Sequence, residues 1–78
     1  MHVTVKLYGT LRRFSLPDTP GIWSGEIPPG STLLDLAALL GAPAEEVAAG
    51  AVNGETLALD TTIPPNAKIM LVTHVNGG

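Results

Sequence analysis

The chain has 78 residues, a formal net charge of −3 and no cysteine. A chain of this length forms one domain, which we assign to residues 1–78. A hydrophobic fraction of 45% with only 14% charged residues is typical of a globular protein. The absence of cysteine excludes a disulfide scaffold, a thiol nucleophile and a cysteine-ligated metal. Four cationic side chains against seven acidic ones argue against nucleic acid as a partner.

The N-terminal third predicts two strands joined by a turn and a loop. Residues 3–8 alternate between apolar and polar side chains, a period of two that predicts a half-buried strand. This start has neither a signal peptide nor a membrane span, so we expect a cytoplasmic protein without membrane contact. Residues 11–14 are expected to form a short turn with Arg12 and Arg13 outward. Two prolines and a glycine predict a loop over 15–21, before a second short strand over 22–27.

The middle of the chain carries the clearest helix signal. Ser31 or Thr32 can cap its start, and Asp35 stands where a capping box needs a carboxylate. Apolar residues then repeat at helical spacing, with Leu34 and Leu39 widening the stripe. The repeating residues are Leu33, Leu36, Ala37 and Leu40. Gly41 is the residue type that ends helices in a left-handed conformation, so we predict a helix over residues 32–40.

The C-terminal half predicts a hairpin and a final strand. Residues 43–49 suggest one further helical turn, with Glu45 and Glu46 in solvent. Asn53-Gly54 readily adopts the two positive φ angles of a type I′ turn, which predicts a hairpin over 51–57. Residues 68–75 are rich in β-branched and aliphatic side chains and are predicted to form a strand.

This order of elements predicts an α+β domain of the β-grasp type. A mixed sheet of four to five strands has one main helix on one face, and the last strand lies parallel to the first. The residues expected on the uncovered face are Thr4, Lys6, Tyr8, Met70, Val72 and His74. An apolar patch at Met70 and Val72 is typical of a partner surface, although a loop covering both residues is an equal alternative.

The candidate catalytic groups do not form an active site. In this architecture His2 and His74 lie at opposite ends of the sheet, so we expect no metal site. Glu45 and Glu46 are adjacent on a turn and point in different directions, which excludes a catalytic pair. Whether the chain is an enzyme subunit therefore depends on its tail.

The tail ends in Asn76-Gly77-Gly78. Two glycines make a thin, flexible segment that, with Val75, is expected to thread a narrow channel in a partner. The Gly78 carboxylate would then be the reacting group. Transfer of AMP from ATP converts a carboxylate into an acylating group, and a sulfur donor can replace the adenylate to leave a thiocarboxylate. The chain is expected to bind no cofactor, because ATP is used by the partner.

Four segments together resemble the ubiquitin-like sulfur carriers of the MoaD/ThiS family. They are residues 3–12, the helix start at 30–36, the hairpin at 51–55, and Gly77-Gly78. The resemblance implies a β-grasp fold and activation by a ubiquitin-activating-type adenylyltransferase. The opening strand is most similar to molybdopterin synthase small subunits, which implies the large subunit as a second partner.

Two other readings of the tail stay open. The chain lacks the prolines that often precede the glycines in the molybdopterin branch, so thiamine synthesis or another sulfur pathway remains an alternative. A ubiquitin-like modifier joined to lysines through Gly78 is a further one. A plain binding module using the Met70 and Val72 face is the third hypothesis, and in it the tail has no role.

Overall fold

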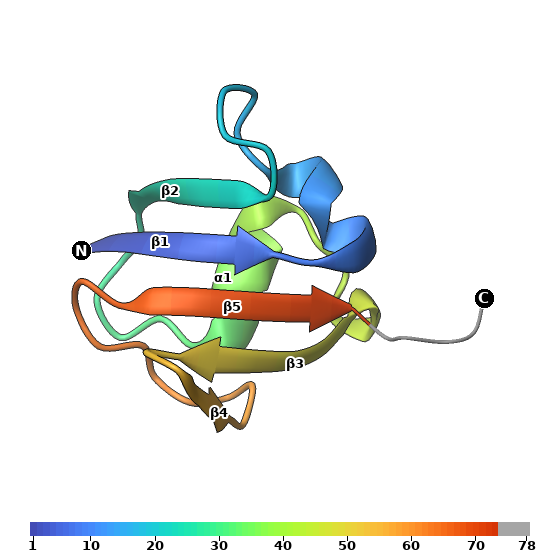
Figure 1. The fold of residues 1–78 in the computed structure, drawn as a ribbon. Helices are drawn as coiled ribbons and strands as arrows, with labels where there is room; N and C mark the ends of the chain where they lie inside the picture. The colour runs from blue at the N-terminus through green and yellow to red at the C-terminus, as the bar shows by residue number, and fades with distance from the viewer. Residues whose placement is uncertain (74–78) are drawn as a thin grey trace.

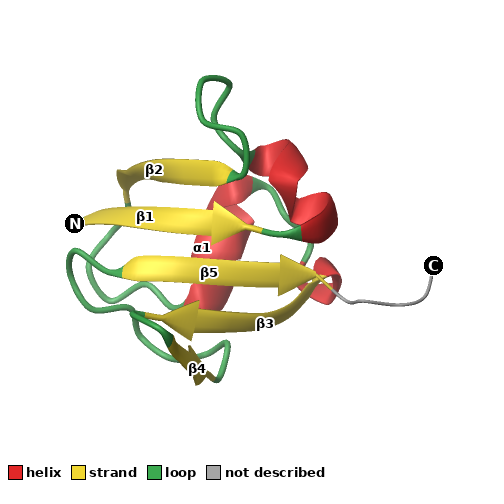
Figure 2. Cartoon of the chain, in the orientation of Figure 1, coloured by secondary structure: helices red, strands yellow, loops and turns green. Residues whose placement is uncertain are grey.

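The structure is a computed structural model that describes residues 1–73. Its strands are β1 (His2–Leu7), β2 (Ile22–Glu26), β3 (Val47–Val52), β4 (Glu55–Leu57) and β5 (Lys68–Thr73). Its helices are α1 (Leu33–Leu40) and the 3-10 helices η1 (Gly9–Phe14) and η2 (Ala44–Glu46). Figure 1 shows that α1 lies across one face of the sheet, and Figure 2 shows the loops that join these elements.

The five strands form one mixed sheet in the order β2-β1-β5-β3-β4. β1 and β2 form an antiparallel hairpin, and β5 lies parallel to β1 as predicted. β3 then pairs antiparallel with the other edge of β5. The predicted β-grasp architecture is confirmed, and β5 is its central strand.

The core lies between the sheet and α1. Every second side chain of a strand points towards the helix, as the alternation of apolar and polar residues predicted. The core side chains include Val3, Val5, Leu7, Leu11, Leu33, Leu36, Ile63, Ile69 and Leu71, all 3% exposed or less. Leu, Ile and Val therefore fill the interior of a chain that has only three aromatic residues.

The helix begins and ends where its capping residues predicted. The Thr32 hydroxyl accepts a hydrogen bond from the Asp35 amide (3.1 Å), and the Thr32 amide donates to the Asp35 carboxylate (2.9 Å). Gly41 follows the helix with a φ of 92°. The wider apolar stripe was wrong, because Leu34 and Leu39 are 37% and 49% exposed. A helix that touches a single sheet buries only a narrow side, and these two residues lie outside it.

The segment before the hairpin differs from the prediction. The helical turn is confirmed only as η2, and β3 begins directly after it, four residues earlier than the predicted hairpin. Pairing with β5 holds this alanine- and glycine-rich segment in a strand despite its weak strand propensity. The hairpin turn itself is as predicted, with φ angles of 52° at Asn53 and 88° at Gly54.

Within residues 1–73, no helix has the combined length and apolarity that crossing a lipid bilayer requires.

Candidate functional site

The predicted site has two parts, a tail and a sheet face, and the structure describes only the face. Gly78, Gly77, Asn76 and Val75 lie outside the described residues, as does His74. The last described residue is Thr73, which ends β5. The tail therefore remains a sequence prediction, and its starting point in the fold is Thr73.

Met70 and Val72 lie on the sheet face opposite α1. The register places Met70 beside Lys6 of β1 and beside Ala51 of β3, while Val72 pairs with Ala49. Met70 is 37% exposed, so the alternative in which a loop covers both residues is wrong for Met70. Val72 is half-buried. Small neighbours on β3 leave the longer methionine side chain standing out from this face.

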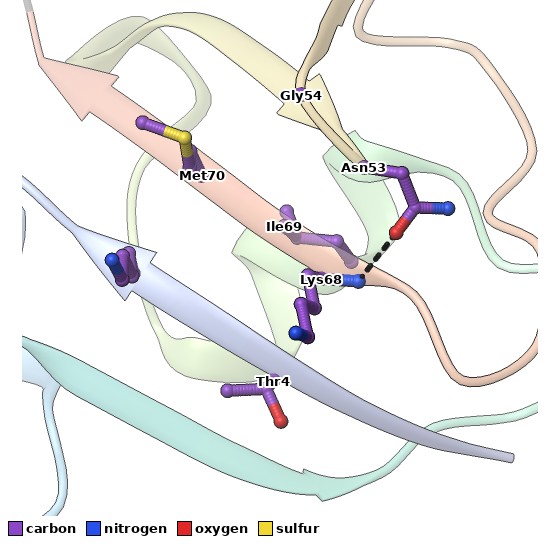
Figure 3. A pocket seen from close by; sticks show the side chains of 7 residues that line it. Thr4, Asn53, Gly54, Lys68, Ile69 and Met70 are labelled. Atoms are coloured by element: carbon purple, nitrogen blue, oxygen red, sulfur yellow. Dashed lines mark hydrogen bonds between the residues drawn. The ribbon is translucent and has the colours of Figure 1, made fainter.

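Two hollows flank Met70 on this face. The larger hollow has a volume of about 540 Å³. It is lined by residues of β1, by the first residues of β5 and by the hairpin turn at Asn53-Gly54. Figure 3 shows Thr4, Lys68 and Met70 around it, with the Asn53 side chain accepting a hydrogen bond from the Lys68 amide (3.0 Å). A smaller hollow of about 130 Å³ lies between Met70, Val72 and β3. Met70 thus forms the ridge between two hollows.

Tyr8 lies at the end of β1 and is 40% exposed. It lines a third hollow, of about 270 Å³, together with Lys6 and Arg12. Lys6 also lines the hollow beside Met70. The predicted face residues that the structure describes therefore come together along one side of the sheet.

Cationic side chains gather along this face. Lys6 and Lys68 line the hollow beside Met70, and Arg12 lines the hollow beside Tyr8. None of the three pairs with a carboxylate of residues 1–73. The chain as a whole is acidic, so this grouping gives the face a positive local charge that the net charge of −3 does not suggest.

A polar cluster at the end of β5 was missed by the sequence analysis. The Arg13 guanidinium donates two hydrogen bonds to the two carboxylate oxygens of Glu46, one of them 2.6 Å long. The Thr10 hydroxyl donates to the same carboxylate (2.6 Å) and lies 3.3 Å from the Thr73 hydroxyl. The expectation that Glu46 is solvated was wrong, since its side chain is only 17% exposed.

The electrostatics of this cluster favour the charged forms. The hydrogen bond from Arg13, and then that from Thr10, lower the pKa of Glu46 to about 2. The same contact with Glu46 raises the pKa of Arg13 above its usual value. Arg13 and Glu46 are separated by 33 residues in the sequence, so no local pattern could have paired them. Only the packing of η1 beside η2 does so.

His2 starts β1 and lies on the same face as the hollows, at its far end. Its ring nitrogen Nδ1 is 3.2 Å from the Glu26 carboxylate, which also lies 3.4 Å from the N-terminal amine. Within residues 1–73, no group of three or more potential metal ligands lies together.

Solved structures with a similar fold include two of small archaeal modifier proteins. SAMP1 from Haloferax volcanii is 20% identical over 100% of both chains, with a TM-score of 0.69. A second structure, of the H. volcanii small archaeal modifier protein 1, is 17% identical over 95% of this chain and 98% of that one, also at 0.69. The fold is a ubiquitin-like β-grasp. No protein-family model matches the chain. A search of curated proteins likewise finds no match.

Proposed function

We propose that this chain is a ubiquitin-like carrier that works through the carboxylate of Gly78. The observation that carries the proposal is the fold, a β-grasp similar to a protein described as a small archaeal modifier protein. In this fold β5 is central and leads directly into the residues before Gly77-Gly78. The described residues offer docking surfaces, while the sequence offers a glycine tail that can carry a reactive group.

The proposed chemistry takes place at the partner. A ubiquitin-activating-type adenylyltransferase catalyses attack of the Gly78 carboxylate on the α-phosphorus of ATP, and pyrophosphate leaves. Hydrosulfide then attacks the carbonyl carbon of the acyl adenylate, AMP leaves, and the product is a thiocarboxylate. Both steps are displacements, so neither needs an oxidant or a reductant. The chain itself binds no cofactor in this scheme, and the protein works in the cytoplasm.

We assign the thiocarboxylate to molybdopterin synthesis, with the molybdopterin synthase large subunit as acceptor of the tail. This branch rests on the opening strand, which resembles the small subunits of that enzyme. A modifier role is the second candidate, because the solved structures of similar fold include one described as a modifier protein. In that role a lysine amine attacks the same adenylate and Gly78 ends in an isopeptide bond.

The activating enzyme is proposed to dock on the face around Met70. Met70 is exposed between two hollows, Val72 and Tyr8 extend the apolar surface, and Lys6 and Lys68 flank it. An apolar ridge with cationic neighbours fits a partner surface that has an apolar pocket bordered by carboxylates. His74 continues the predicted face and belongs to the same proposal.

Intact mass spectrometry tests the carrier role. The protein is incubated with ATP, sulfide and a purified activating enzyme of the same source. We expect a mass increase equal to the difference between sulfur and oxygen, located on Gly78. Deletion of Gly78, or addition of one alanine after it, should abolish the gain. A wild-type mass that stays unchanged with every co-encoded activating enzyme would refute the carrier role.

The molecule that reacts with the activated tail distinguishes the sulfur carrier from the protein modifier. Transfer of sulfur to the precursor held by a molybdopterin synthase large subunit supports the molybdenum branch. Gly-Gly remnants on cellular lysines that disappear on deletion of Gly78 support the modifier.

The docking face is tested with two matched variants. Met70→Lys and Leu39→Lys each place a charge at an exposed apolar residue, but Leu39 lies on the helix side of the molecule. We expect Met70→Lys to raise the KM of the activating enzyme for this chain roughly tenfold or more, since buried anchors dominate interface energies. Leu39→Lys should leave KM unchanged. Equal effects of the two variants would contradict docking at this face.

A further inference from the structure

Three elements meet at Thr73, the last described residue before the tail. Thr10 and Arg13 belong to η1, and the carboxylate that they both contact, Glu46, belongs to η2. In β3, Val47 pairs with Thr73. The Thr10 hydroxyl has one proton and donates it to Glu46, so Thr73 supplies the proton of the bond between the two hydroxyls. The side chain at the base of the tail is thereby linked to a charged pair.

The backbone around Thr73 is held by further contacts. The Tyr8 amide donates to the carbonyl of Leu71 (3.1 Å), which fixes the start of η1 against β5. β3 has a register shift between Val47 and Ala49, at the position where it pairs with the end of β5. Bulges of this kind occur beside functional sites, where they redirect a side chain or end the pairing of two strands.

The Arg13–Glu46 pair has the geometry of a fixed contact. The guanidinium meets the carboxylate through both of its oxygens, an arrangement that restricts direction as well as distance. Arg13 also donates to the carbonyl of Thr10 (2.8 Å) and lies over the Phe14 ring at 4.3 Å. The low pKa of Glu46 keeps this carboxylate charged at any pH near neutrality.

We propose that Thr10, Arg13 and Glu46 are positioning residues that anchor the base of the tail. By holding Thr73, they set the direction in which the chain leaves the sheet towards Gly78. The inference rests on the proposed function, because the direction of the tail matters only if Gly78 must reach an active site in a partner. None of the three residues touches the reacting carboxylate.

The pair is a contact whose loss should leave the fold intact. Arg13 is half exposed, so solvent screens the ion pair, and its loss is expected to lower the melting temperature without unfolding the domain. The core residues that hold the sheet to α1 lie elsewhere. An effect of Glu46→Gln on the reaction would therefore report the direction of the tail and not unfolding.

The experiment compares Glu46→Gln with Glu45→Gln. Glu45 is the neighbouring carboxylate, it is exposed, and its side chain makes no hydrogen bond to the residues of the cluster. Steady-state kinetics of Gly78 activation are measured for both variants, together with amide order parameters by NMR relaxation for residues 71–78. Melting temperatures confirm that both variants are folded.

We expect Glu46→Gln to lower kcat about three- to thirtyfold with KM unchanged, below the roughly hundredfold loss that a misplacement of 1 Å causes. The order parameters from Thr73 onwards should fall in the same variant, and Glu45→Gln should match wild type in both measurements. Exchange of the two charges, Arg13→Glu with Glu46→Arg, should restore part of kcat.

Two outcomes overturn the inference. If Glu46→Gln and Glu45→Gln have the same kcat and the same order parameters, the cluster does not anchor the tail. If Glu46→Gln lowers only the melting temperature, its role is structural. The NMR measurement needs no activating enzyme, so it tests the anchor even if Gly78 is never activated. Conversely, activation of Gly78 in wild type would support the carrier role even if the order parameters showed no anchor.

Discussion

Substitution of Gly9 by alanine is expected to be among the most destabilising small changes in this chain. Gly9 starts η1 with a φ of 62°, a conformation that costs a residue with a side chain about 1–2 kcal/mol. A Cβ atom there would also lie only 2.2 Å from Cγ2 of Thr73. Thr73 is β-branched, in a strand, and hydrogen-bonded to Thr10, so it cannot turn away freely.

The magnitude follows from these two costs. Forcing an extra carbon into a packed site costs about 1–3 kcal/mol, which with the backbone strain gives about 2–5 kcal/mol for Gly9→Ala. A domain of 78 residues has a total stability of roughly 4–12 kcal/mol. The substitution is therefore expected to remove a large share of the folding free energy.

Gly54→Ala is the matched control. Gly54 also has a positive φ, of 88°, but no atom lies within 4 Å of its Cβ position. Its substitution should cost only the strain of about 1–2 kcal/mol. Urea unfolding followed by the fluorescence of Trp23, the one tryptophan in the sequence, measures both variants.

A second substitution, at Thr73, separates the steric cost of Gly9→Ala from its backbone strain. Thr73→Ser removes Cγ2 but keeps the hydroxyl, and the next nearest atom, Cβ of Thr73, is 3.4 Å away. Gly9→Ala combined with Thr73→Ser should therefore recover about 1–3 kcal/mol, measured as a double-mutant cycle. A loss for Gly9→Ala no larger than that for Gly54→Ala would refute the reasoning.

Three other predictions test the core, the helix cap and the ion pair. Leu36→Ala should cost about 2–5 kcal/mol by urea unfolding, because Leu36 is fully buried, whereas Leu39→Ala should cost less than about 0.5. Thr32→Ala removes one half of the capping box and should cost about 0.5–2 kcal/mol in the same assay. The pKa of Glu46 is lowered to about 2, so its stabilisation is complete above the unfolded value of about 4.3 and lost as the pH falls towards 2. The gap in melting temperature between wild type and Glu46→Gln should close over that range, and a gap that stays constant from pH 7 to 2 would contradict the pairing.

The fold was largely predictable because its signals are local. Alternation over residues 3–8, the Thr32–Asp35 capping box and the Asn53-Gly54 turn each specify one element from neighbouring residues. The length of β3 was not predictable in the same way. Residues 47–50 include alanines and a glycine, and they form a strand because β5 pairs with them. Tertiary pairing outweighed propensity there.

The candidate site likewise has one part that the sequence predicts and one part that only the fold reveals. The placement of Met70 on an exposed face followed from alternation alone, since a strand in a one-helix sheet must turn every second residue away from the helix. The Arg13–Glu46 pair has no sequence signal, because two short 3-10 helices far apart in the chain bring it together. A contact made by topology becomes visible only when the topology is known.

The position of β5 explains how one small domain can serve both docking and delivery. β5 is paired with β1 on one side and with β3 on the other, and its last residue, Thr73, pairs with Val47 of β3. Met70 on this strand lies three residues before Thr73, and a strand rises about 3.3 Å per residue. The proposed docking ridge and the base of the tail are thus about 10 Å apart on one rigid element. A partner that binds Met70 would thereby receive the tail at a fixed distance, and the Thr10–Arg13–Glu46 anchor would add the direction.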